Sequence, residues 1–169
     1  EMCIRDRAHT DPAAALDAYE KTILAAPQQR LHTDPVVHAY AITARRCGFH
    51  REHLVAFFSS MRADLTHREY SPSELQDYIY GSAEAIGLLC LQIFLAEENV
   101  SPADRAAMER GARALGSAFQ KINFLRDLRE DSSTLGRTYF QQAPSGRIDE
   151  ATKSALIAEI RRELATAAL

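Results

Sequence analysis

One short segment of the chain places an amide and two carboxylates at regular four-residue intervals. Asn123, Asp127 and Asp131 follow one another in this way within residues 120–131. Because an α-helix turns by about 100° per residue, a four-residue step rotates by only ~40°, so the three side chains share one helix face over about 12 Å. Such oxygen ligands suit a hard cation such as Mg²⁺, which is often held by one or two carboxylates together with substrate phosphates.

The same spacing also fits a solvated helix face, where Lys121, Arg126 and Arg129 would pair with the acids. Two observations favour a buried site. The first is a set of apolar neighbours: Ile122, Phe124, Leu125 and Leu128. We therefore expect much of this helix to be buried, and buried acids need a cation or hydrogen-bond partners. The second is Arg137 in the following loop, a candidate phosphate ligand.

Three segments of the chain together resemble the squalene/phytoene synthase family. Residues 115–131 and 136–140 resemble its second aspartate-rich signature. Residues 61–70 resemble its Arg-x-Asp-Leu…Tyr segment, and residues 78–87 resemble its Tyr-x-Tyr-Gly-x-Ala-x-x-x-Gly segment. The segments stand in the family's order, over about residues 34–140, and the second signature is most similar to that of bacterial phytoene synthases.

The resemblance implies an all-α fold, part of an isoprenoid synthase-type helical bundle. It implies a phytoene synthase-like transferase that condenses two geranylgeranyl diphosphates head to head and releases diphosphate. The product would be phytoene, the first carotenoid, made through a cyclopropyl diphosphate without a nicotinamide cofactor. Mg²⁺ would be the cofactor, with Mn²⁺ as an alternative, and prenyl diphosphates would be the partners.

Functional residues are carried over from the family by position. The expected metal ligands are Asn123, Asp127 and Asp131. The expected catalytic residues are Asp127, Asp131 and Arg137. The expected substrate-binding residues are Tyr78, Ala83, Gly87, Gln120, Asn123, Arg126 and Arg137.

The sequence departs from the family in one respect. The family's first aspartate-rich motif, Asp-x-x-x-Asp after an arginine, is not found, because Asp6, Asp11 and Asp17 lack its spacing. We therefore expect residues 1–169 to be one domain that is an internal fragment of a longer synthase, inactive alone. Residues 1–7 differ in character and are read as a non-native leader.

Two other functions stay open beside phytoene synthesis. One is squalene or dehydrosqualene synthesis from C15 farnesyl diphosphate, since chain-length choice depends on a few pocket residues. The other is a non-catalytic helical scaffold related to prenyl synthases. The scaffold is disfavoured by the residues that suit a metal and diphosphate, because a scaffold does not need them. These residues are Asn123, Asp127, Asp131 and Arg137.

Charge, cysteine content and the longest apolar stretch indicate the binding partners and the cellular compartment to be expected. The net charge is −3 and the pI about 6.1, which argues against a nucleic-acid-binding face. Cys3, Cys47 and Cys90 form no disulfide or zinc pattern, which fits a reducing cytosol. The longest apolar stretch, residues 85–96, is too short to span a bilayer and is read as a core helix. We expect a cytoplasmic protein, with peripheral contact with a membrane surface left open.

Helix starts recur as a capping residue followed by proline, which favours the first helical position. They occur at residues 11, 34, 71 and 101, and a fifth is expected near residue 149. The predicted helices are residues 12–26, 35–47, 51–67, 72–97, 102–132 and 149–166. No alternating β-branched run predicts a strand.

Several residues have both a structural and a functional interpretation. Ala83 and Gly87 lie four apart and suit either a prenyl-chain groove or close helix packing. For Asp64, a salt bridge with Arg62 is favoured slightly over a catalytic role. The six histidines are scattered, and even the pair at residues 50 and 53 is interpreted as surface histidines, because no third ligand stands at fixed spacing.

Overall fold

The computed structural model describes residues 11–67, 69–130, 139 and 148–168, which form helices and no β-strand. The elements are α2 (Pro12–Ala25), the 3₁₀ turn η1 (Ala26–Gln28), α3 (Pro35–Cys47), α4 (Arg51–Thr66), α5 (Pro72–Ile79), the π-helical η2 (Tyr80–Glu84), α6 (Ala85–Phe94), α7 (Pro102–Glu130) and α8 (Glu150–Ala167). This confirms the predicted all-α class.

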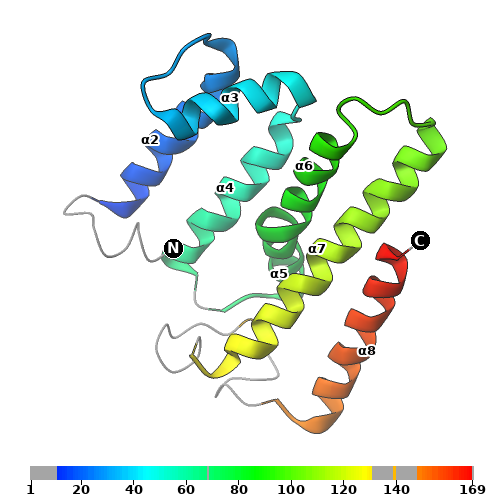
Figure 1. The fold of residues 1–169 in the computed structure, drawn as a ribbon. Coiled ribbons are helices and arrows are strands. Elements are labelled where there is room, and N and C mark those ends of the chain that lie inside the picture. The colour runs from blue at the N-terminus through cyan, green and yellow to red at the C-terminus, as the bar shows by residue number, and fades with distance from the viewer. Residues whose placement is uncertain (1–10, 68, 131–138, 140–147, 169) are drawn as a thin grey trace.

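The helices pack as a row (Figure 1). The continuous α5–η2–α6 helix lies between α4 and α7, α8 packs along α7, and α2 packs on α4. The predicted helix bounds that fall on described residues are confirmed to within one or two residues, with one exception, whereas the predicted end at residue 132 lies outside the described residues. The helix predicted over 72–97 contains the π-helical segment and ends at Phe94.

Local capping explains where the helices begin. The Asp11, Asp34 and Asp149 carboxylates accept hydrogen bonds from amides in the first turns of α2, α3 and α8. Ser71 and Glu74 form the predicted capping box at α5. These short-range contacts satisfy amides that have no partner within the helix, so they could be predicted without knowledge of the tertiary fold.

Two of the three hydrophobic clusters among the described residues link the outer helices of the row. The larger one joins α2, α3, α4 and α6 through buried Leu16, Ile23, Val37, Leu54, Phe58 and Leu89. The other joins α7 to α8 through Ala118, Leu156 and Ile160. The α7–α8 contact also carries buried Lys121, whose Nζ donates to Glu159 at 2.6 Å and to Glu163 at 2.5 Å.

The π-helical segment is an irregularity that the sequence did not predict. The amide of Ala85 donates to the carbonyl of Tyr80, five residues earlier. Within this segment, a Cβ added at Gly81 would lie 2.2 Å from both the Ala56 carbonyl oxygen and the Ser60 hydroxyl. Glycine is therefore required where η2 presses against α4. Segments of this type are rare and often occur at functional sites.

Arg62 and Asp64 do not form the salt bridge expected between them. Arg62 reaches from α4 to α2, where it pairs with Asp17 and Glu20 at 2.6 Å each. Asp64 is buried instead and accepts a hydrogen bond from the Tyr78 hydroxyl at 3.0 Å. The prediction was wrong because the two side chains project toward different neighbours, a consequence of tertiary packing.

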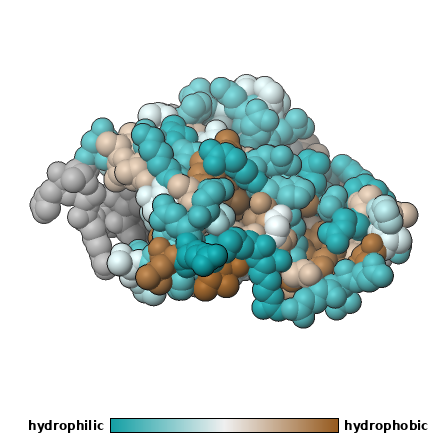
Figure 2. Space-filling view, turned by 90° about the horizontal axis from the view of Figure 1, so that it is seen from above, coloured by the Kyte–Doolittle hydropathy of each residue, from teal (hydrophilic) through white to brown (hydrophobic). Residues whose placement is uncertain are grey.

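Apolar side chains reach the surface beside hydrophilic ones (Figure 2). On α7, Phe124 is buried as expected, whereas Ile122 is 40% exposed, contrary to the expectation for this helix. Cys47 and Cys90 are free thiols. Within the described part of the chain, the longest apolar helices fall short of what is needed to cross a bilayer.

Candidate active site

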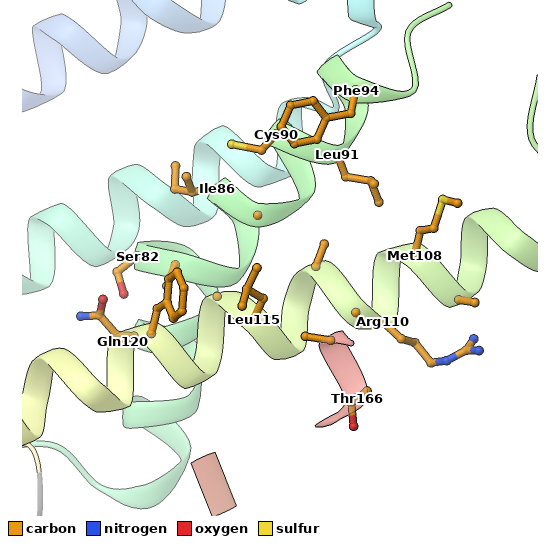
Figure 3. Close-up of a pocket in the computed structure, with 18 of the residues that line it drawn as sticks. Ser82, Ile86, Cys90, Leu91, Phe94, Met108, Arg110, Leu115, Gln120 and Thr166 are labelled. Atoms are coloured by element: carbon orange, nitrogen blue, oxygen red, sulfur yellow. The ribbon is translucent and has the colours of Figure 1, made fainter. Parts of the chain in front are cut away.

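A groove of about 790 Å³ lies between the η2–α6 segment and α7 (Figure 3). Most of its lining is apolar: Ala83, Ile86, Leu91, Phe94, Met108, Leu115 and Phe119. The last turn of α8 contributes Thr166 and Ala167. Phe94 is 74% exposed and Phe119 56% exposed, so the groove is open to solvent in this chain.

One end of the groove carries amide and hydroxyl groups. Ser82 and Gln120 face each other across this end (Figure 3), and half-buried Asn123 lies one turn further along α7. The Ser82 hydroxyl donates to the Tyr78 carbonyl at 2.7 Å, a contact that joins the π-helical segment to the last turn of α5. Polar groups at one end and an apolar channel beyond them suit a ligand with a polar head and a long apolar tail.

Asp127 follows Asn123 by one helical turn and forms a two-pronged ion pair with its neighbour. Arg126 donates from Nε to Oδ1 at 2.7 Å and from Nη2 to Oδ2 at 2.6 Å. This contact lowers the pKa of the Asp127 carboxyl below its usual value. At neutral pH the site therefore holds a carboxylate and a guanidinium side by side, near the polar end of the groove.

The groove brings together four residues predicted to bind substrate: Ala83, Gly87, Gln120 and Asn123. Arg126 and Asp127 lie just beyond its lining. Asp131 and Arg137 lie outside the described residues. Sequence reasoning did not assign Leu115 and Phe119 to the groove, although their spacing from Gln120 and Asn123 places them on adjoining positions of one helix face.

Tyr78 lies apart from the groove, in a buried aromatic cluster. Its ring centroid is 5.1 Å from that of Tyr70, 6.1 Å from Phe124 and 5.7 Å from Tyr139. Phe124 and Tyr139 stack at 4.1 Å. Burial strongly raises the pKa of the Tyr78 hydroxyl, and the adjacent Asp64 charge adds to this effect, so Tyr78 stays a neutral donor.

The two walls of the groove touch at glycines. A Cβ added at Gly87 would lie 2.6 Å from the Ala112 carbonyl oxygen, and one added at Gly116 would lie 2.7 Å from the Ala83 carbonyl oxygen. Gly87 therefore lines the groove and also lets α6 approach α7 closely, while its contact with a prenyl chain stays a prediction.

The chemistry of the donors fits a hard divalent cation. The Asn123 amide and the Asp127 carboxylate both offer oxygen ligands, as Mg²⁺ prefers. The third expected ligand, Asp131, is beyond the described residues. Among those that are described, the one group of three metal-ligating side chains whose ligand atoms come within 4.8 Å of one another is a different one: His50, Glu52 and His53.

The chain is similar in sequence to proteins of one known family. The family model described as "Squalene/phytoene synthase" matches residues 3–143. Phytoene synthase 3, chloroplastic, of Zea mays is 43% identical over 86 residues, which cover 48% of this chain and 19% of the relative. The 4,4'-diapophytoene synthase of Staphylococcus haemolyticus is 32% identical over 111 residues, covering 65% of this chain and 36% of the relative. The chain thus matches about a fifth of one curated relative and little more than a third of the other.

A solved structure shares the fold. The crystal structure of squalene synthase HpnC from Alicyclobacillus acidocaldarius matches with a TM-score of 0.68 at 24% identity. The match covers 96% of this chain and 64% of that structure. At this identity the likeness shows the helical architecture alone.

Proposed function

Because the chain belongs to the squalene/phytoene synthase family, we propose that it forms one wall of the active site of a prenyl transferase. This enzyme would join two prenyl diphosphates head to head and release diphosphate. The observation that carries the proposal is the groove, with Gln120 and Asn123 at one end and an apolar channel beyond them. Diphosphate would lie at the polar end, and the prenyl tail would lie along the channel.

The mechanism begins with ionisation of an allylic diphosphate. Asn123, Asp127 and Asp131 would hold Mg²⁺, which when bound supplies positive charge to the leaving group. Arg126 and Arg137 would add fixed positive charge where negative charge develops. The Arg126 guanidinium lowers the pKa of the Asp127 carboxyl, which favours the ionised form that would bind the metal. The apolar walls would exclude water from the carbocation, which water would otherwise quench.

Geranylgeranyl diphosphate is the substrate we favour, with phytoene as the product. Two observations support a long tail. Met108 and Asn123 are separated by about 22 Å of α7 at 1.5 Å per residue, and both line the groove. The Zea mays relative is also named a phytoene synthase. The second candidate is a C15 reaction that gives squalene or dehydrosqualene, which draws support from the relative named as a diapophytoene synthase.

The proposal is tested on the full-length protein that contains this chain. Purified enzyme is assayed with geranylgeranyl and farnesyl diphosphates and Mg²⁺, and the products are identified by mass. We expect phytoene, and a loss of turnover of roughly 10²-fold or more for Asp127→Ala. Asp104→Ala is the matched control, since Asp104 lines the other end of the groove on the same helix. Circular dichroism verifies that both variants keep their helicity.

Three other outcomes of this assay would change the proposal. Turnover of farnesyl diphosphate alone would replace the C20 assignment by the C15 one. Full activity in Asp127→Ala would end the metal assignment. If neither substrate reacts, although the folded full-length protein is present with Mg²⁺ or Mn²⁺, the catalytic proposal fails and a scaffold role takes its place.

A further inference from the structure

Two histidines and a glutamate meet at the start of α4, away from the groove. The ligand atoms of His50, Glu52 and His53 all lie within 4.8 Å of one another. The His50 and His53 rings are 5.6 Å apart, and His50 Nδ1 is 3.7 Å from a Glu52 carboxylate oxygen. None of the three lines the groove.

His53 is the fixed member of this group. It is only 7% exposed, whereas His50 and Glu52 are exposed. Its Nδ1 is 3.1 Å from the hydroxyl of Tyr80, the first residue of the π-helical segment. If Nδ1 carries the proton and donates it to Tyr80, the Nε2 lone pair is left for a metal. Metal-ligating histidines are commonly oriented in this way by a hydrogen bond from their second nitrogen.

We propose that His50, Glu52 and His53 bind a Zn²⁺ ion in a site distinct from the proposed active site. Two imidazoles and a carboxylate, with water as the fourth ligand, form a familiar zinc ligand set. Imidazole ligands favour Zn²⁺ over Mg²⁺, which prefers oxygen ligands. Tetrahedral ligands at about 2.0–2.1 Å from zinc lie roughly 3.3 Å apart, so the exposed His50 and Glu52 side chains close in while His53 stays in place.

The surroundings contain charges of both signs. The Arg113 guanidinium lies over the Tyr80 ring, 5.3 Å from its centroid, and its Nε donates to Glu84. Its positive charge is thus already paired with a carboxylate. A bound ion would tie the first turn of α4 to Tyr80 through His53. The proposed effect of the ion is therefore to fix the His53 ring against Tyr80 and so to hold η2 against α4.

The test measures metal binding rather than catalysis, so its result is independent of the proposed prenyl transfer. The 169-residue chain, free of purification tags, is titrated with Zn²⁺ by calorimetry and with Co²⁺ by visible absorption. We expect one saturable site, a Co²⁺ spectrum typical of nitrogen and oxygen ligands, and a rise in unfolding temperature with Zn²⁺ that equal Mg²⁺ does not produce.

Variants assign the site to individual side chains. His50→Ala and Glu52→Gln change exposed residues and should each weaken Zn²⁺ binding by about tenfold or more, as should Tyr80→Phe through the lost hydrogen bond. His67→Ala is the matched control. His67 also lies beside a carboxylate, 3.8 Å from Glu74, but among the described residues no second histidine completes a metal site there. This variant should bind Zn²⁺ like the wild-type chain.

Two results would overturn the proposal. One is wild-type affinity in both His50→Ala and Glu52→Gln. The other is a thiolate-to-Co²⁺ charge-transfer band, which would place the metal on cysteines such as Cys47 or Cys90. His53→Ala is not needed for the decision, because loss of a buried side chain could unfold the chain.

Discussion

Gly87 faces Ala112 so closely that a Cβ at Gly87 would lie 2.6 Å from the Ala112 carbonyl oxygen. A contact that short has to be relieved by moving one backbone away from the other. The width of the groove beside it is therefore linked to the packing of α6 on α7.

We predict that Gly87→Ala destabilises the chain although alanine favours helices. Overpacking at a helix crossing costs about 1–3 kcal/mol of unfolding free energy. Gly111→Ala is the control, since its Cβ would meet its nearest atom at 3.7 Å, an ordinary contact, and it should gain stability by up to about 1 kcal/mol. Urea unfolding measures both. Equal stability changes in the two variants would show that α6 and α7 can separate at no cost.

The buried Tyr78 should make the fold sensitive to alkali. Because its pKa is raised in the folded chain, the folded state keeps the phenolic proton that the unfolded state releases above pH ~10. The stabilising contribution is therefore complete below that pH and is lost as the pH rises. Each such proton steepens the fall by about 1.4 kcal/mol per pH unit.

Comparison with Tyr78→Phe isolates this effect. At pH 7 the variant should be less stable by about 1–3 kcal/mol, because Asp64 loses a hydrogen-bond donor. Above pH ~10 the difference from the wild type should shrink. Unfolding curves of the two proteins between neutral and alkaline pH would contradict the prediction if they stayed parallel.

The Lys121 network should hold α8 onto α7. We predict that Lys121→Met destabilises the chain by about 1–3 kcal/mol, because Glu159 and Glu163 lose a shared partner, although Glu159 keeps access to water and Glu163 keeps a hydrogen bond from Ser117. Lys153→Met removes an exposed pair with Glu150 within α8 and should cost no more than about 1 kcal/mol. Thermal or urea unfolding compares them. A loss as small for Lys121→Met as for Lys153→Met would show that apolar contacts alone hold α8.

Substrate length can be tested by position along the groove, given the proposed function. Met108 lies far from Asn123, so Met108→Trp in the full-length enzyme should shorten the channel. We expect kcat/KM to fall by about tenfold for the C20 diphosphate and to change little for the C15 one. Ser82→Trp, at the polar end, should depress both. Equal losses with both substrates in Met108→Trp would place the tail elsewhere.

Most of the fold could be predicted from the sequence because helix starts are local. An acid or serine before proline, as at Asp34 and Ser71, acts within three residues of itself. Contacts between residues that are distant in the chain could not be predicted in this way. Arg62 finds Asp17 rather than Asp64, and His53 is buried against Tyr80, because helix packing decides these contacts.

The candidate site was partly predictable for the same reason. Ala83, Gly87, Gln120 and Asn123 do line one groove, since each pair shares a helix face. The place of Tyr78 was not predictable, because the π-helical turn between Tyr78 and Gly87 breaks the regular spacing from which faces are counted. The groove itself needed two helices whose relative position no local pattern specifies.

That wide turn takes up one residue more than a regular helix of the same rotation would need. Five residues of a π-helix turn the chain about as far as four residues of an α-helix, because each π-helical hydrogen bond spans five residues instead of four. Deleting one residue between Tyr80 and Glu84 should therefore leave α6 nearly in phase with α5 and keep Ile86 and Gly87 at the groove. An extra residue inserted in the regular helix α6 would instead turn everything beyond it by about 100°. The π-helical segment is thus the place in this helix where a change of length by one residue disturbs the groove least.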